Sequence, residues 1–444
     1  MKHLLVILVL FHFSSNILGQ ILDGGNGHAI ILDKQGYVWT IGRNNYGQLG
    51  DSTLIQSNVP LKVPRLKDIV AISRGYDHSI ALHKEGHLHL WGRNNYGQLG
   101  CASVNDQMTP QQLPNHHNFK AIEGGHWHTT ALKKDGTVWA WGHNYFGELG
   151  NGTREHSAWP VQVVQSSGGS ISTLSDVKSI ATVGYHTLAL KHDGTVWGWG
   201  ANSFHELGKK GDFYQQVAIR IEGIPKIKAI AVGWHHSVAL DENGHIWVWG
   251  SDPAFQFNEA TMRYYDQPIA FIGLPKFTKI ACGSWHTLAI DQNQHVWGWG
   301  KNHFGMLGTG DTISHSLPVM IPGLNNIIDI GGGCFQSLAL DSTGHIFTFG
   351  DNPSGQQGLG NFERCFEPQP MALLADGTFI GGNQCTIDTN SLHGTAQPAE
   401  NFPPQKNISS LIKLAKYSFF LLSVLANILL YLKIKKLTSH GLQQ

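Results

Sequence analysis

The sequence carries little charge and no excess of either sign. Asp, Glu, Lys and Arg make up 14% of the 444 residues, whereas they make up roughly 25% of a typical globular protein. The 31 basic side chains balance the 31 acidic ones. A protein that binds nucleic acid through its phosphates normally carries a basic excess or a basic tract. We therefore expect no nucleic-acid partner.

Cysteine is also scarce. The five cysteines are too few to staple a fold of this length, and no C-x-x-C pair occurs. We therefore expect neither a zinc site nor a thioredoxin-like redox site of that spacing. The odd number leaves at least one thiol unpaired within the chain. Cys282 and Cys334 lie in apolar stretches and are predicted to be small core residues.

Motifs that carry catalytic chemistry are missing as well. The sequence has no Walker loop, no H-E-x-x-H, no G-x-S-x-G and no Gly-rich dinucleotide loop. We expect no enzyme, no catalytic residue and no cofactor. The 26 histidines raise a metal site as an alternative, with close pairs at His87/His89, His126/His128 and His235/His236. Six histidines, however, occupy one position of a repeat, which favours a structural role.

That repeat is built around glycine and tryptophan, with 53 and 14 residues in the chain. The segment WGRNNYGQLG at 91–100 recurs in seven variants, and the steps between their lead glycines are 50, 50, 58, 50, 50 and 50 residues. The lead glycines are Gly42, Gly92, Gly142, Gly200, Gly250, Gly300 and Gly350. A second landmark keeps the same step: His28, His78, His128, His186, His236 and His286, with Gln336 in the seventh place. Two landmarks in one register exclude chance similarity.

Each unit contains short β-favouring runs separated by turn residues, for example 69–73, 79–82 and 88–91. Seven such units predict an all-β, seven-bladed β-propeller, whose small sheets bury their faces on one another. The paired tryptophans of the W-x-W-G segments are predicted to fill the wedge between adjacent blades. Each repeat histidine is predicted to bond a turn carbonyl through a ring nitrogen. A partial eighth copy at 379–387 predicts that the chain's end supplies a strand beside its beginning and closes the ring.

Both ends of the chain have the features of membrane-directed segments. Residues 1–19 have the layout of a secretory signal, which is either cleaved or kept as an anchor. Residues 411–433, from Leu411 to Lys433, predict a transmembrane helix, since the 22 residues at 411–432 span about 33 Å as a helix. The alternative is an amphipathic helix on the surface. Residues 391–410 predict a linker, and residues 434–444 predict a short basic tail. The propeller is then expected to comprise residues 20–390. With a secretory signal in front of it, the propeller is expected to lie on the exported side of the membrane.

The segments GYDHSIAL at 75–82 and WGRNNYGQLG at 91–100 resemble the repeat of the regulator of chromosome condensation family. The resemblance spans all seven units and implies a seven-bladed propeller. Family members include Ran exchange factors, a plant ultraviolet photoreceptor and secreted β-lactamase inhibitors, so the fold does not select a function. The exchange factors insert a wedge before the Pro-Val segment, whereas here six units keep 18 residues between lead glycine and proline, as in Gly42/Pro60. The photoreceptor's arginine beside tryptophan in G-W-R-H-T is absent too.

An aromatic residue precedes the repeat position in six units. The six are Tyr76, Trp127, Tyr185, Trp234, Trp285 and Phe335. Because this turn joins the two inner strands of a blade, the six are predicted to ring one face around the central channel, where exposed aromatics favour protein recognition. The alternative is that they pack on the next blade. A second aromatic set follows the G-Q-L-G turns and is predicted to set partner choice: Trp159, Phe213, Tyr214, Tyr264, Tyr265, Phe362 and Phe366.

These features together favour a membrane-anchored or exported scaffold that binds a partner protein through one propeller face, without chemistry. The alternative is a guanine-nucleotide exchange regulator of a Ran-like small GTPase, delivered into a host cell as a bacterial effector.

Overall fold

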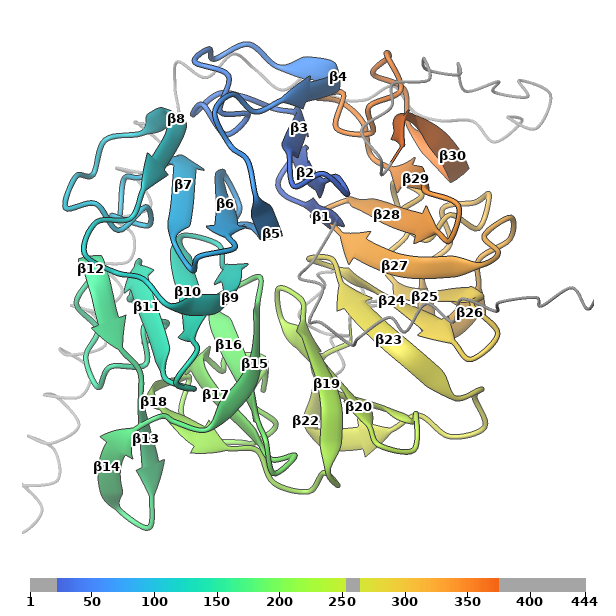
Figure 1. The fold of residues 1–444 in the computed structure, drawn as a ribbon. Coiled ribbons are helices and arrows are strands. Elements are labelled where there is room, and N and C mark those ends of the chain that lie inside the picture. The colour runs from blue at the N-terminus through green and yellow to red at the C-terminus, as the bar shows by residue number, and fades with distance from the viewer. Residues whose placement is uncertain (1–21, 253–263, 375–444) are drawn as a thin grey trace, which may run out of the picture. The chain divides into compact units, whose positions relative to one another are not determined.

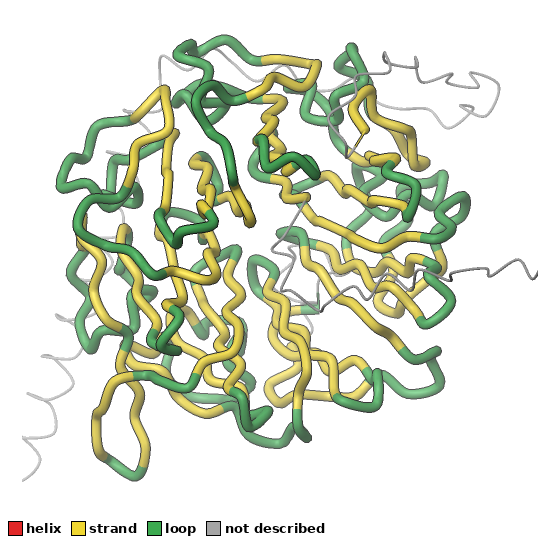
Figure 2. The backbone as a smooth tube through the Cα atoms, viewed as in Figure 1, coloured by secondary structure: helices red, strands yellow, loops and turns green. Residues whose placement is uncertain are grey.

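The computed structural model describes residues 22–252 and 264–374. Within these two ranges the chain forms strands joined by turns and loops, and no helix occurs (Figure 2). All the described residues belong to the first of two compact units, which comprises Met1–Cys385. The predicted all-β class is therefore confirmed for the described residues.

Seven β-sheets, the blades, stand around a common axis with the first strand of each blade innermost (Figure 1). Blades 1 and 2 consist of β1 (Leu22–Gly24), β2 (His28–Leu32), β3 (Val38–Gly42), β4 (Ser57–Lys62), β5 (Ile69–Arg74), β6 (His78–His83), β7 (Leu88–Gly92) and β8 (Gln107–Gln112). Blades 3 and 4 consist of β9 (Phe119–Gly124), β10 (His128–Lys133), β11 (Val138–Gly142), β12 (Ser157–Gln162), β15 (Val177–Thr182), β16 (His186–Lys191), β17 (Val196–Ala201) and β18 (Tyr214–Arg220). Blades 5 and 6 consist of β19 (Ile227–Val232), β20 (His236–Asp241), β21 (Ile246–Ser251), β22 (Tyr264–Ala270), β23 (Phe277–Cys282), β24 (His286–Asp291), β25 (Val296–Gly300) and β26 (His315–Met320). Blade 7 consists of β27 (Ile327–Gly332), β28 (Gln336–Asp341), β29 (His345–Gly350) and β30 (Cys365–Leu374).

The ring closes where blade 1 packs on blade 7. The innermost strand of blade 1 is β1, which pairs with β2 through three residue pairs and contacts β27 and β28. The predicted C-terminal closing strand at 379–387 lies outside the described residues. Strand β1, although only three residues long, is the innermost strand of blade 1 and completes its four-stranded sheet.

One insertion departs from the regular blade. The extra residues after the third unit form a hairpin of β13 (Val164–Ser167) and β14 (Ser170–Thr173). Strand β13 runs parallel to β18 and pairs with it through Gln165 and Ala218, so the hairpin extends blade 4 at its outer edge (Figure 1). Because β13 directly follows the last strand of blade 3, this crossing ties the two blades together.

Tryptophans fill the wedges between blades, as predicted. Trp141 is fully buried and packs with Ala71 and Ile80 of the preceding blade, and Trp139 contacts the same cluster. The Trp141 indole N–H donates to the carbonyl of Gln98, 2.9 Å away. The equivalent fully buried side chains are Trp91, Trp199, Trp249 and Trp299. The W-G tryptophan therefore joins neighbouring blades through both apolar burial and a hydrogen bond.

The two sequence landmarks share a register because they are partners across one pair of strands. His78, the first residue of β6, lies opposite Gly92, the last residue of β7, and every other blade repeats this pairing. Gly92 has φ of +99°, and a Cβ there would lie 2.6 Å from the carbonyl oxygen of Asp77. Only glycine adopts this conformation without strain, which explains its recurrence.

The predicted bond from the repeat histidine to a turn carbonyl is wrong, because the ring reaches the next blade instead. His78 Nε2 lies 3.0 Å from the Thr129 hydroxyl of blade 3, and that hydroxyl donates to the carbonyl of Gln98, 2.8 Å away. The same link to a Ser or Thr hydroxyl recurs for His28, His128, His186, His236 and His286. The repeat histidines therefore connect blades rather than stiffen single turns.

This link fixes the tautomer of the ring. The Thr129 hydroxyl gives its only proton to Gln98, so His78 must donate from Nε2 and leave Nδ1 unprotonated. Consistently, Nδ1 of His78 is buried without a hydrogen-bond partner among the described residues. Burial lowers the pKa of His78 to about 3, and it lowers the pKa of the other five repeat histidines as well. The repeat histidines are neutral at pH 7.

The glycine three residues before the repeat histidine leaves room for its ring. A Cβ at Gly75 would lie 1.9 Å from Cε1 of His78, so Gly75→Ala forces the ring away from Thr129. We expect this variant to lower the free energy of unfolding by about 1–3 kcal/mol, the usual cost of overpacking, as measured by urea denaturation.

A double-variant cycle separates this contact from other effects of the added methyl group. In a His78→Ala background the space is open, and Gly75→Ala is expected to cost much less. An equal cost in both backgrounds contradicts the steric explanation.

Candidate protein-interaction face

The propeller has one face, here called the loop face, that carries two connections from each blade. The register places the repeat histidine and the lead glycine at the same end of their strands. The turn between first and second strands and the loop between third and fourth strands therefore emerge together. The opposite face carries the turns between second and third strands and the connections to the next blade. Both predicted aromatic sets belong to connections or strand ends of the loop face.

Three rings from blades 2, 3 and 5 meet at the axis on the loop face. The ring centroids of Tyr76 and His126 are 4.1 Å apart, those of His126 and Trp234 are 5.4 Å apart, and those of Tyr76 and Trp234 are 6.0 Å apart. Tyr76 belongs to blade 2 and Trp234 to blade 5, on the far side of the ring. These three residues, the axial cluster, thus pack against each other: Tyr76 contacts His126 of the next blade, and Trp234 contacts both from across the axis.

Further predicted aromatics surround the axial cluster. The rings of Trp127 and Tyr185 are 6.1 Å apart, and both contact His126. Trp285 is buried and lies 5.0 Å from Trp234. Phe335 is the exception among the six, since its ring contacts Phe304 at 5.1 Å. The structure therefore brings five of the six predicted side chains together with one histidine.

His126 was predicted only as one of a histidine pair that raised a metal site, and its place among the aromatic rings was missed although the repeat contained the signal. The six predicted aromatics occupy two positions, because Tyr76 and Trp234 stand two residues before the repeat position and the others one residue before it. The third unit has an aromatic at both, and His126 is the ring two residues before His128. An alignment of the units by position places His126 with Tyr76 and Trp234.

The axial cluster is uncharged at neutral pH. Burial raises the pKa of Tyr76 to about 12 and lowers the pKa of His126 to about 3. The indole N–H groups of Trp127 and Trp234 are buried and have no acceptor among the described residues. The loop face therefore has an apolar centre with two unused hydrogen-bond donors.

A continuous line of rings runs from this centre to the rim across blades 3 and 4. Tyr185 lies 5.4 Å from Phe146, and Phe146 lies 5.0 Å from Tyr145. The Arg154 guanidinium sits 4.7 Å from the Tyr145 ring and 4.6 Å from the Tyr214 ring. Its Nε donates to the carbonyl of Tyr145, 2.7 Å away. We call Tyr185, Phe146, Tyr145, Arg154 and Tyr214 the aromatic track.

Exposed apolar side chains accompany the track on the same loops. Phe213 is 72% exposed, Tyr145 57% and Trp159 45%. Tyr264, Phe362 and Phe366 of the second predicted set are also exposed, whereas Tyr214 and Tyr265 are half-buried. The loops add exposed aliphatic residues at Leu54, Ile55, Val104 and Ile313. Exposed apolar side chains that lie on neighbouring loops are a common feature of surfaces that contact other proteins.

Two histidines of this face pair with carboxylates. His143 Nδ1 lies 2.7 Å from Glu148, and His235 Nδ1 lies 3.2 Å from Glu206. Among residues 22–252 and 264–374, no three His, Cys, Asp or Glu side chains converge as a metal site would require.

The described cysteines comprise a half-buried free thiol, Cys101, two buried thiols and one disulfide-bonded residue. Cys282 and Cys334 are buried and reduced, as predicted for core residues. Burial raises the pKa of the Cys282 thiol to about 12. Cys365, at the start of β30, is disulfide-bonded.

The predicted membrane-directed segments lie outside the described residues. These are the signal at 1–19, the linker at 391–410, the span at 411–433 and the tail at 434–444. In the part of the chain that the structure describes, no helix has the length and apolar character to cross a bilayer.

Comparisons with known proteins find the same fold in solved structures. Human WBSCR16 is 21% identical over 76% of this chain and 93% of that chain, with a TM-score of 0.65. Prp20p from Saccharomyces cerevisiae is 27% identical over 70% of this chain and 80% of that chain, with a TM-score of 0.61. Yeast RCC1 (Prp20), from its complex with Kap60, is 19% identical over 84% of this chain and 91% of that chain, with a TM-score of 0.67. No curated protein sequence matches the chain. The model of the RCC1-like domain matches residues 11–258 and 121–396, so the chain belongs to the RCC1-like domain family.

Proposed function

We propose that this protein is a non-enzymatic interaction scaffold that binds a partner protein through the loop face. The observation that carries the proposal is the aromatic track, which links the axial cluster to an exposed rim at blades 3 and 4. Tyr, Trp and Arg are the residue types that contribute most to binding at protein interfaces. A rigid aromatic surface also loses little side-chain entropy on binding.

We further propose that the propeller is anchored to a membrane and lies on the exported side, with residues 434–444 in the cytosol. The apolar segments at 1–19 and 411–433 support this arrangement. The disulfide at Cys365 gives independent support, since disulfides persist in exported compartments and are rare in the cytosol. The alternative is delivery of the protein into a host cell.

The partner site is tested by co-purification of bound proteins with the tagged full-length chain from solubilised membranes. Tyr145→Ala/Trp159→Ala removes two exposed rings and is expected to lower partner recovery at least tenfold, because hot-spot truncations cost about 2 kcal/mol or more each. The melting temperature should stay near that of the unmodified protein.

The matched control is Ile272→Ala. Ile272 is 88% exposed and lies between β22 and β23, on the opposite face. This variant is expected to recover the partner at the unmodified level. Loss of the partner with Ile272→Ala, or full recovery with the double variant, contradicts the assignment to the loop face.

A second candidate function is regulation of a Ran-like GTPase. It is favoured by the similarity to Prp20p, whose structure was described together with its binding to Gsp1p and histones. Release of bound nucleotide from a purified Ran-like GTPase tests it, and no acceleration at a molar excess of the protein argues against exchange activity. Co-purification of a small GTPase without exchange activity supports the scaffold function instead.

A further inference from the structure

A cavity of about 490 Å³ lies in the channel between the inner strands, beneath the axial cluster. Its wall is formed by β15, β19, β23 and β27 together with Asp23, Arg74 and Glu123. Sites for small molecules typically measure about 300–1,000 Å³. None of the three residues of the axial cluster lines the cavity, so it is separate from the proposed partner surface.

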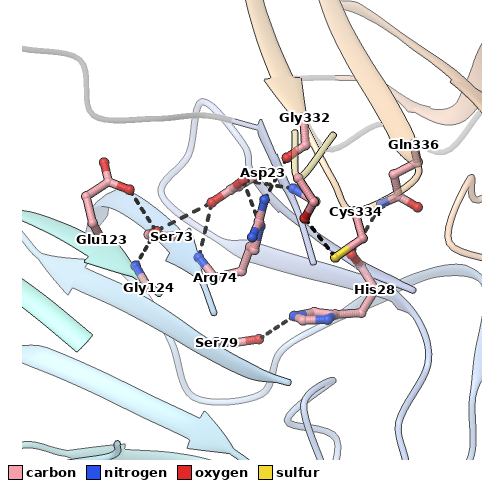
Figure 3. A network of polar contacts seen from close by, with 12 residues as sticks. Asp23, His28, Ser73, Arg74, Ser79, Glu123, Gly124, Gly332, Cys334 and Gln336 are labelled. Atoms are coloured by element: carbon pink, nitrogen blue, oxygen red, sulfur yellow. Dashed lines mark hydrogen bonds and ion pairs between the residues drawn. The ribbon is translucent and has the colours of Figure 1, made fainter. Parts of the chain in front are cut away.

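The floor of the cavity is a buried polar network (Figure 3). Arg74 Nε lies 3.2 Å from the Asp23 carboxylate, and Arg74 Nη2 donates to the carbonyl of Gly332, 2.8 Å away. Ser73 Oγ lies 3.4 Å from both Asp23 and Glu123. Arg74 therefore extends from blade 2 to blade 7 and closes the channel on the side of the loop face.

The rim carries cations at equivalent positions of neighbouring strands. Lys178 and Lys228 are the second residues of β15 and β19, and both line the cavity. These strands start at the face opposite the loop face, so the cavity opens there. Lys178 is exposed and makes no hydrogen bond or ion pair within the described residues. Lys228 Nζ meets only a backbone carbonyl, that of Phe277, at 3.5 Å.

Pairing the charges of the lining leaves a net positive site. Arg74 neutralises Asp23, and Lys279 pairs with Asp329. The groups without an ionic partner are Lys178 and Lys228 at the rim and Glu123 at the floor. Burial raises the pKa of the Glu123 carboxyl well above its usual range, which favours a protonated group that donates a hydrogen bond. The remaining wall is mostly apolar, with alanine, valine and isoleucine side chains such as Ala231, Val232 and Ile230.

We propose that this cavity binds a small organic anion that bears hydroxyl groups, of the sugar phosphate class. Lys178 and Lys228 bind the anionic group at the rim, where an ammonium forms charge-assisted hydrogen bonds to phosphate oxygens. Glu123, held by Ser73, binds a hydroxyl group at the floor. The apolar wall contacts the carbon skeleton.

Isothermal titration calorimetry of the full-length protein in detergent tests this site with glucose 6-phosphate as the probe. We expect saturable binding of the probe and weaker binding of inorganic phosphate or glucose. Lys178→Gln/Lys228→Gln is expected to weaken probe binding at least tenfold, since a hydrogen bond to a charged group contributes about 1.5–3 kcal/mol. Glu123→Ala should weaken binding of glucose 6-phosphate and leave that of inorganic phosphate unchanged.

Lys120→Gln is the matched control, because Lys120 is the second residue of β9 but does not line the cavity. This variant is expected to bind the probe like the unmodified protein. Three results overturn the proposal: no binding of glucose 6-phosphate at millimolar concentration, an equal effect of Lys120→Gln, or equal affinities for glucose 6-phosphate and inorganic phosphate. The lysine variants alter rim side chains, so unchanged melting temperatures identify any loss as a binding effect.

Discussion

Arg74→Met is expected to lower the free energy of unfolding by about 3–5 kcal/mol, the usual cost of breaking a buried ion pair by removing one partner. The Arg74 and Asp23 side chains are only 2% and 8% exposed. Methionine fills a similar volume but leaves the Asp23 carboxylate and the Gly332 carbonyl without the guanidinium (Figure 3). Because these three residues belong to blades 2, 1 and 7, the change acts where the ring closes. Equilibrium urea unfolding measures the loss.

The pH dependence of this loss identifies its electrostatic origin. Burial raises the pKa of Asp23, and Arg74 opposes that rise. Without the guanidinium the folded-state pKa of Asp23 rises further, so the folded state favours the protonated carboxyl. Such a group contributes stability at low pH and loses it as the pH rises through its folded pKa. We therefore expect Arg74→Met to cost more at pH 8 than at pH 5.

Two further variants delimit the interpretation. Asp23→Asn/Arg74→Met removes both charges and is expected to recover part of the stability. Lys84→Ala breaks an ion pair to Asp68 in which both side chains are largely exposed, and such pairs contribute about 0–1 kcal/mol. A loss for Arg74→Met as small as that for Lys84→Ala means that the buried pair does not stabilise ring closure.

The fold was predictable because its local signals repeat. The runs at 69–73, 79–82 and 88–91 match β5, β6 and β7 to within one residue at each end. The histidine and glycine landmarks kept one register because they are cross-strand partners. The partner of the repeat histidine was not predictable in the same way. The hydroxyl group that bonds the histidine ring belongs to the next blade, as the Thr129 hydroxyl does for His78. This contact depends on how the blades pack rather than on spacing within one unit.

The loop face was predicted in outline and missed in detail. The turn position placed Tyr76, Trp127 and Trp234 at the correct end of the propeller. The sequence did not show that rings from blades 2, 3 and 5 meet across the axis around His126, because this contact depends on the width of the closed channel. The cavity was missed for the same reason, since Lys178 and Lys228 are unremarkable lysines until the ring brings their strands to one wall.

Acidification is expected to destabilise the propeller strongly because of the repeat histidines. Burial holds the folded-state pKa of His28, His78, His236 and His286 at about 3, and that of His128 at about 4. A histidine in the unfolded chain has a pKa of about 6.5. The unfolded state therefore binds more protons, and stability falls as the pH decreases from about 6.5 toward the folded pKa values. Each histidine contributes a loss of about 1.4 kcal/mol per pH unit in that window.

Several histidines together outweigh the opposite trend of the buried carboxyls. The raised pKa values of Asp23, Asp77 and Glu123 stabilise the fold at low pH relative to high pH, but these are three groups against six. We expect the free energy of unfolding, from urea denaturation at half-unit pH steps, to fall by several kcal/mol between about pH 7 and pH 5. A flat profile over that range contradicts the neutral, buried state of the repeat histidines.

The seventh blade supplies the matched variant for this test. Gln336 takes the place of the histidine there, and its amide donates to the carbonyl of His28, 3.2 Å away. His78→Gln therefore introduces a side chain that the repeat already accommodates and that does not titrate. Below about pH 6 this variant should lose about 1.4 kcal/mol less per pH unit than the unmodified protein. The difference isolates one histidine, because both proteins share every other titrating group, and an unchanged slope assigns the acid sensitivity to groups other than the inter-blade links.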